Sequence, residues 1–134
     1  MATRIVIEKQ QGHLPSIEIH LNVLLTAKPG NTSVYRSPAV HKDDRQLQMS
    51  PVGHQLMERI EMIPGLGSLM YCSYSFQFNL ALAFDHAGIL LEVVDIIRQV
   101  LDDELEIHVQ SNKQTPPAQI QMEEVGQKLR ELTA

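Results

Sequence analysis

Alternation of apolar and polar positions dominates the first part of the chain and predicts β-strands. Within residues 16–26, every second position from Ile17 to Val23 is apolar, while Glu18 and His20 lie between them. A period of two with one apolar side is typical of a strand that buries one face and exposes the other. Further strands are predicted at residues 4–9, 67–75, 76–84 and 104–110. One face of the 76–84 strand carries Phe76, Phe78, Leu80, Leu82 and Phe84.

Segments in which apolar residues recur at helical spacing lie between these strands and after the last one. Ser50-Pro51 is typical of a helix start, with a serine cap and a proline in the first turn, and Pro64-Gly65 ends that helix. A second helix is predicted after Asp85, its expected cap, and it reaches Leu101 with one broad apolar face. Residues 118–132 are a third helical candidate, which carries only a narrow apolar stripe.

The order of these elements, β-β-α-β-β-α-β with a C-terminal helix, predicts an α+β fold. Hairpins joined by helices favour a two-layer sandwich, in which a mostly antiparallel sheet has its helices on one face. Residues 1–110 are expected to form a single domain with a long, irregular and mobile loop at 27–49, and residues 111–134 a linker and an amphipathic helix or tail. The predicted shared core comprises Ile19, Leu21, Leu56, Ile60, Phe78, Leu80, Leu90, Val93, Ile97 and Ile107.

The amino-acid composition argues against some classes of function but does not identify the function. The 134 residues carry a net charge of −5 and only 4% aromatic residues, which argues against a nucleic-acid partner. The most apolar stretch, residues 80–101, is interrupted by charged side chains, so no membrane span is expected. One cysteine, Cys72, excludes a disulfide within the chain and favours a reducing, cytoplasmic location.

A near-duplication gives the sharpest chemical signal. Two six-residue segments match in every residue class: Ile17-Glu18-Ile19-His20-Leu21-Asn22 and Leu105-Glu106-Ile107-His108-Val109-Gln110. If the two strands lie side by side, Glu18, His20, Glu106 and His108 would cluster on the polar face of the sheet. Two imidazoles and two carboxylates could bind a divalent metal such as zinc or move protons. The alternative is that these side chains are the solvated face of an open sheet.

Two other features invite a chemical interpretation, and both have simpler explanations. Cys72 lies in a predicted strand, where a small buried hydrophobe is the simpler role than a nucleophile. Gly65-Leu66-Gly67 follows a helix and precedes a strand, the reverse of a dinucleotide-binding loop, and is interpreted as a helix stop and turn. No catalytic or cofactor-binding residue is assigned from the sequence.

Residues 50–101 resemble part of a known family. Ser50-Pro51 at a helix start, Ile63-Pro64-Gly65 at its end, a strand pair and a closing helix are similar to the N-terminal domain of the Nfu/NifU iron–sulfur scaffold family. The family's opening Thr-Pro-Asn-Pro motif and its cluster-holding Cys-x-x-Cys are both missing here. The resemblance therefore implies a similar α/β layout, and no cluster ligand transfers to this chain.

These observations lead to one leading hypothesis and two alternatives. The leading one is a small non-catalytic interaction or accessory protein with a protein partner or a homo-oligomeric state. The first alternative is a metal-binding or acid–base enzyme that uses Glu18, His20, Glu106 and His108 on the open sheet face. The other, which rests on the family resemblance, is an accessory factor in iron–sulfur or metal delivery.

Overall fold

The computed structural model describes residues 2–10, 12, 15–29, 35–36 and 49–134. Most of the predicted loop, residues 30–34 and 37–48, lies outside the described residues, so its predicted mobility stays a prediction. The strands are β1 (Thr3–Gln10), β2 (Ser16–Leu21), β3 (Tyr35–Arg36), β4 (Leu66–Tyr71), β5 (Ser75–Leu80), β6 (Leu105–Gln110) and β7 (Ala118–Ile120). The helices are α2 (Pro51–Ile60), α3 (His86–Leu101), the short 3₁₀ helix η1 (Met122–Glu124) and α4 (Val125–Thr133).

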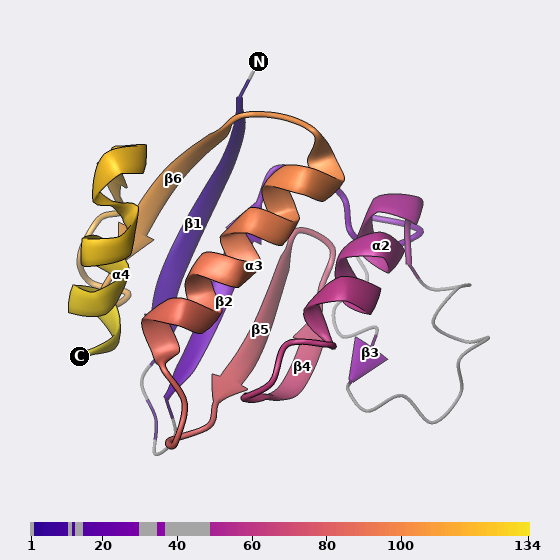
Figure 1. Cartoon of the computed structure of the whole chain (residues 1–134). Helices are drawn as coiled ribbons and strands as arrows, with labels where there is room; N and C mark the ends of the chain where they lie inside the picture. The colour runs from indigo at the N-terminus through magenta and orange to yellow at the C-terminus, as the bar shows by residue number, and fades with distance from the viewer. Residues whose placement is uncertain (1, 11, 13–14, 30–34, 37–48) are drawn as a thin grey trace.

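The described residues form a seven-stranded sheet in the order β3-β4-β5-β2-β1-β6-β7. All neighbouring strands are antiparallel except β1 and β6, which run parallel. Helices α2, α3 and α4 lie on one face of this sheet (Figure 1). The predicted α+β sandwich, with a mostly antiparallel sheet and helices on one face, is therefore confirmed.

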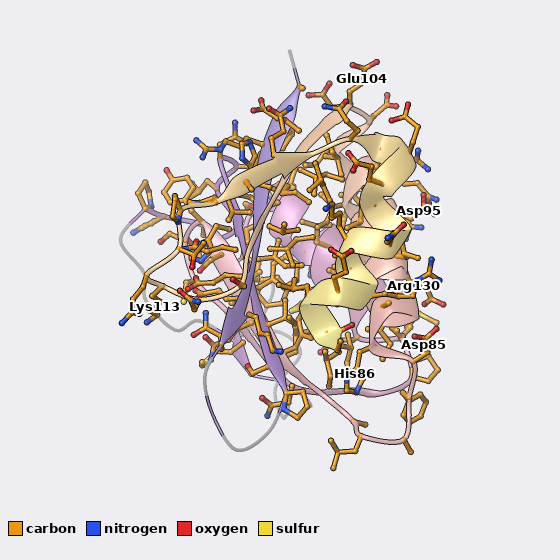
Figure 2. All side chains as sticks on the ribbon, turned by 90° about the vertical axis from the view of Figure 1, so that its left-hand side faces the viewer. Asp85, His86, Asp95, Glu104, Lys113 and Arg130 are labelled. Atoms are coloured by element: carbon orange, nitrogen blue, oxygen red, sulfur yellow. The ribbon has the colours of Figure 1, made fainter. Side chains whose placement is uncertain are left out.

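Alternation along the strands separates a packed face from an open one. The packed face meets α2 and α3, and the whole predicted core, from Ile19 to Ile107, is buried there in one cluster. Seen from the side, α3 and α4 with Asp95 and Arg130 lie on one side of the sheet and Lys113 on the other (Figure 2). In the described part of the chain, no helix covers the second face.

The two predicted helix starts have different caps. Gly53 N donates a hydrogen bond of 2.9 Å to Ser50 Oγ, and Pro51 occupies the first turn of α2, as the sequence predicted. Asp85 occupies the cap position of α3, but its side chain makes no capping hydrogen bond. The start of α3 therefore depends more on the burial of its apolar face than on its cap.

The C-terminal segment differs from the predicted single helix over 118–132. Residues 118–120 form β7, where Ile120 pairs with Ile107 of β6, and α4 begins only at Val125. Because β7 occupies the edge of β6, it satisfies backbone groups that would otherwise be unpaired. Leu129 and Leu132 of α4 are buried in the main core, so this segment docks on the domain.

One expectation for the end of β5 is wrong. The strand stops at Leu80, and Leu82 and Phe84 are exposed rather than part of the core face. The chain turns here, since Phe84 N donates to Ala81 O at 3.2 Å before α3 starts. Alternation in the sequence thus continues four residues beyond the strand, to Phe84. Within the described residues, no helix is long and apolar enough to cross a membrane.

We predict that Leu129→Ala lowers the free energy of unfolding by about 2–5 kcal/mol, because Leu129 is fully buried where α4 docks. The matched control is Leu82→Ala, at a leucine that is largely exposed, which should change it by less than about 0.5 kcal/mol. Chemical denaturation followed by circular dichroism measures both. Equal effects of the two substitutions would show that α4 does not dock.

Candidate functional site

The open face of the sheet carries the residues that the sequence singled out. On β1, the side chains of Arg4, Val6 and Glu8 alternate with buried Ile5 and Ile7. The polar positions of the neighbouring strands share this face, because each pairs directly with one of these three residues. Figure 1 shows β1 between β2 and β6.

The register places the two predicted histidines in one row across three strands. Val6 pairs with His20 of β2 on one side and with His108 of β6 on the other. Strands β2 and β6 are therefore not neighbours, since β1 lies between them. At about 4.7–4.9 Å per strand, the backbones at His20 and His108 lie about 9–10 Å apart.

Consequently the four predicted site residues form two separate Glu–His pairs. His20 Nε2 lies 3.0 Å from Glu8 Oε1 on β1 and 3.7 Å from Glu18 Oε1. His108 Nε2 lies 2.9 Å from Glu106 Oε1. In the described part of the chain, the one group of three metal-ligating residues with ligand atoms close together is Glu8, Glu18 and His20.

Glu8 is the site residue that sequence reasoning missed. It is the most buried of the carboxylates in these pairs, with 7% of its side chain exposed, against 42% for the side chain of His20. Its directly paired residue on β2 is Glu18. The signal was present in the alternation of residues 4–9, but the register of the hairpin was needed to bring Glu8 opposite Glu18.

Two neighbouring polar side chains hold Glu18 in place. Gln10 Nε2 donates to Glu18 Oε1 at 3.1 Å, and Ser75 Oγ of β5 donates to Glu18 Oε2 at 3.0 Å. Each carboxylate oxygen of Glu18 thus has a fixed donor. The second pair, His108 and Glu106, has Arg4 as the residue opposite its carboxylate instead of another acid.

Cys72 lies beside the Glu8–Glu18–His20 cluster rather than in the core. It follows β4 in the turn before Ser75 and is half-buried, so the expectation of a buried hydrophobe is only partly met. Burial raises the pKa of the Cys72 thiol, a hydrogen bond with Ser75 opposes this, and the negative charge of Glu18 raises the pKa further. A thiol held in its protonated form is a poor nucleophile.

A second feature is a group of exposed apolar side chains at one end of the sandwich. Met62, Leu82 and Phe84 are 81%, 76% and 46% exposed, and we call these three residues the loop patch. Their two loops lie side by side, because Ala81 N donates to Gly65 O at 2.9 Å. Asp85 and His86 mark this end of the molecule in Figure 2.

Gly65 is required for this arrangement. Its φ of +93° is a conformation that favours glycine, and an added Cβ would lie 2.7 Å from Cγ of Phe84. The glycine therefore ends the segment after α2 and lets the ring of Phe84 sit against the backbone. The turn at Gly65 agrees with the prediction, whereas the predicted helix stop is wrong in place, because α2 already ends at Ile60 and Leu66 and Gly67 belong to β4.

A cavity of about 460 Å³ lies elsewhere, between the start of β2 and the end of α4. Its lining includes Lys9, His86 and Glu131, but no residue of either Glu–His pair. Lys9 Nζ donates to the backbone oxygen of Ala134 at 3.5 Å, and His86 Nε2 lies 2.8 Å from Ala81 O. The charged groups of this cavity are thus partly engaged with the backbone.

Comparison with known proteins finds no family model that matches the chain, and no curated protein or solved structure matches it either. None of these comparisons bears on the resemblance over residues 50–101.

We predict that His20→Ala lowers the free energy of unfolding by about 1–3 kcal/mol. The substitution removes the hydrogen-bonding partner of the buried Glu8 carboxylate, and such a loss costs the desolvation of that group. His108→Ala is the control: its ring is itself largely buried, but its partner Glu106 is 41% exposed and stays solvated, so the cost should be smaller than that of His20→Ala. Urea denaturation of the two variants measures the difference, and equal costs would contradict the role given to Glu8.

We further predict that Glu18→Gln lowers the pKa of Cys72, because it removes the negative charge that opposes thiolate formation. Alkylation by iodoacetamide at pH 8 should therefore be faster in this variant than in the unaltered protein. The pKa should still exceed its ordinary value, since burial is the larger cause. Alkylation rates between pH 7 and 10 give the pKa, with Glu106→Gln as the control, and unchanged rates in Glu18→Gln would contradict the contact.

Proposed function

We propose that this chain is a small non-catalytic interaction protein that binds a protein partner through the loop patch. The observation that carries the proposal is the exposure of three large apolar side chains on two adjacent loops. Single exposed apolar residues are ordinary, whereas several of them on two neighbouring loops favour an interaction site. Full burial of an exposed side chain of this size is worth about 1.5–3 kcal/mol. Met62 and Leu82 are the two most exposed of the three, so they would contribute most to a complex.

Charge favours a different protein over a second copy of this chain. Asp85 directly follows Phe84 of the loop patch in sequence, and the whole chain has a net charge of −5. A symmetric dimer through the patch would bring these like charges together, because the same surface faces itself. The partner that fits is an apolar segment flanked by lysine or arginine.

An acid–base enzyme is the weaker alternative. The Glu–His pairs are separated by β1, and the cavity of about 460 Å³ is lined by neither of them. The thiol of Cys72 has a raised pKa and is not activated. These observations support an interaction role better than a catalytic one.

We predict that a photo-crosslinking amino acid at position 82 captures one partner in cells that express the protein. The same amino acid at position 91 is the control, because Leu91 is also exposed but lies on α3 away from the loop patch. Mass spectrometry of the adduct identifies the partner. With the purified partner, Leu82→Ser should weaken binding at least tenfold, since an apolar anchor is lost, while Leu91→Ser should leave it unchanged.

Three results would contradict the proposal. Equal adducts from positions 82 and 91, or none from position 82, would mean that the loop patch is not a specific interface. An adduct of twice the chain mass would identify the occupant as a second copy and would contradict the inference from charge.

A further inference from the structure

The Glu8–Glu18–His20 cluster lies on the open face, on strands β1 and β2, and is separate from the loop patch. Its three ligand atoms, one from each residue, lie within 4.8 Å of one another. Ligands bound to one zinc ion at about 2.0–2.2 Å are at most about 4.4 Å apart, so small rotamer changes suffice. We propose that Glu8, Glu18 and His20 form a binding site for a divalent transition-metal ion, with Zn²⁺ as the best fit.

The charges of the cluster point independently to a cation. Glu8 and Glu18 are directly paired across β1 and β2, an arrangement of like charges that is destabilising in a sheet. Among the described residues, no lysine or arginine lies within ion-pair distance of either carboxylate. A protonated His20 supplies only one positive charge, whereas a divalent ion with neutral His20 balances both carboxylates.

The surroundings of the cluster suit an ion with one open coordination position. Glu8 is buried, Glu18 is held by Gln10 and Ser75, and hydrogen bonds of this kind orient metal ligands. The ring of His20 is 42% exposed, so the remaining position faces solvent. Three protein ligands and one open position are the arrangement that zinc adopts in sites that bind a water or a substrate.

The types of ligand narrow the choice of ion. An imidazole nitrogen favours zinc and the neighbouring transition metals, while a site for Mg²⁺ or Ca²⁺ is built from oxygens. Among the described residues, the ligand atoms that lie within 4.8 Å of one another come from Glu8, Glu18 and His20, and Cys72 is not one of this group. Nitrogen and oxygen ligands without sulfur are therefore expected.

The second Glu–His pair supplies a matched control within the same sheet. His108 and Glu106 are as close as His20 and Glu8, at 2.9 Å against 3.0 Å, and His108 lies in the same row. This pair has Arg4 opposite its carboxylate and, in the part of the chain that the structure describes, no third ligand nearby. Two ligands beside an arginine should bind zinc weakly.

The test is calorimetric titration of the full chain with Zn²⁺, and separately with Mg²⁺. We expect one zinc ion per chain, no measurable binding of Mg²⁺, and weaker zinc binding as the pH falls because the ligands must lose protons. His20→Ala and Glu8→Gln should each weaken zinc binding at least tenfold, whereas His108→Ala should change it less than twofold. X-ray absorption of the zinc complex should show nitrogen and oxygen ligands only.

Three outcomes would overturn the site. The first is the absence of stoichiometric zinc binding, and the second is an equal loss of binding in His20→Ala and His108→Ala. The third is a sulfur ligand in the absorption spectrum. If Glu8→Gln fails to fold, as circular dichroism would reveal, Glu18→Gln decides the role of the carboxylates. None of these measurements depends on the loop patch, so the site and the proposed function are tested separately.

Discussion

The two-sided pairing of β1 determines both faces of this molecule. One edge of the strand pairs antiparallel with β2 and the other parallel with β6, and these two pairings set every cross-strand neighbour at the centre of the sheet. On one face the register stacks Ile7 beside Ile19, and on the other it places Glu8 beside Glu18. A slip of one residue would exchange the two faces, so burial of the isoleucines also fixes the position of the acids.

Within the described part of the chain, helices cover only one face of the sheet because only that face is apolar. Helices α2, α3 and α4 all lie against the apolar face, which removes the isoleucines and phenylalanines of the strands from water. On the opposite face polar side chains hydrogen-bond to one another, as the contacts of Glu18 with Gln10 and Ser75 show. Among the described residues, the largely exposed side chains of Met62 and Leu82 belong to neither face and lie in end loops.

Local periodicity was sufficient to predict the layers of the fold. The core residues from Ile19 to Ile107 were predicted from spacing alone, because burial repeats every two or every three to four positions. Periodicity failed at Leu82 and Phe84, since it does not show where a strand loses its partner and the chain turns. It also failed at residues 118–120, where pairing with β6 outweighed a weak helical stripe.

Only part of the candidate site could be predicted from the sequence, because the site depends on which residues face each other across two strands. Glu18 and His20 stood out because their pattern recurs at Glu106 and His108, but nothing local marked Glu8 as their partner. Which residue on one strand faces which on another is set by the register, and the register emerges from the packing of the whole sheet. A short sequence motif therefore identifies ligands on its own strand and misses those on the next.

The two copies of the motif show how strand direction controls chemistry. Both place a glutamate and a histidine on the same face, and both histidines pair with Val6. Because β2 runs antiparallel to β1, its glutamate lies opposite Glu8, whereas β6 runs parallel and its glutamate lies opposite Arg4. The first arrangement gathers negative charge that a cation can balance, and the second already has a positive residue opposite the acid. The two similar segments thus have different surroundings, because β1 lies between them and pairs antiparallel with β2 but parallel with β6.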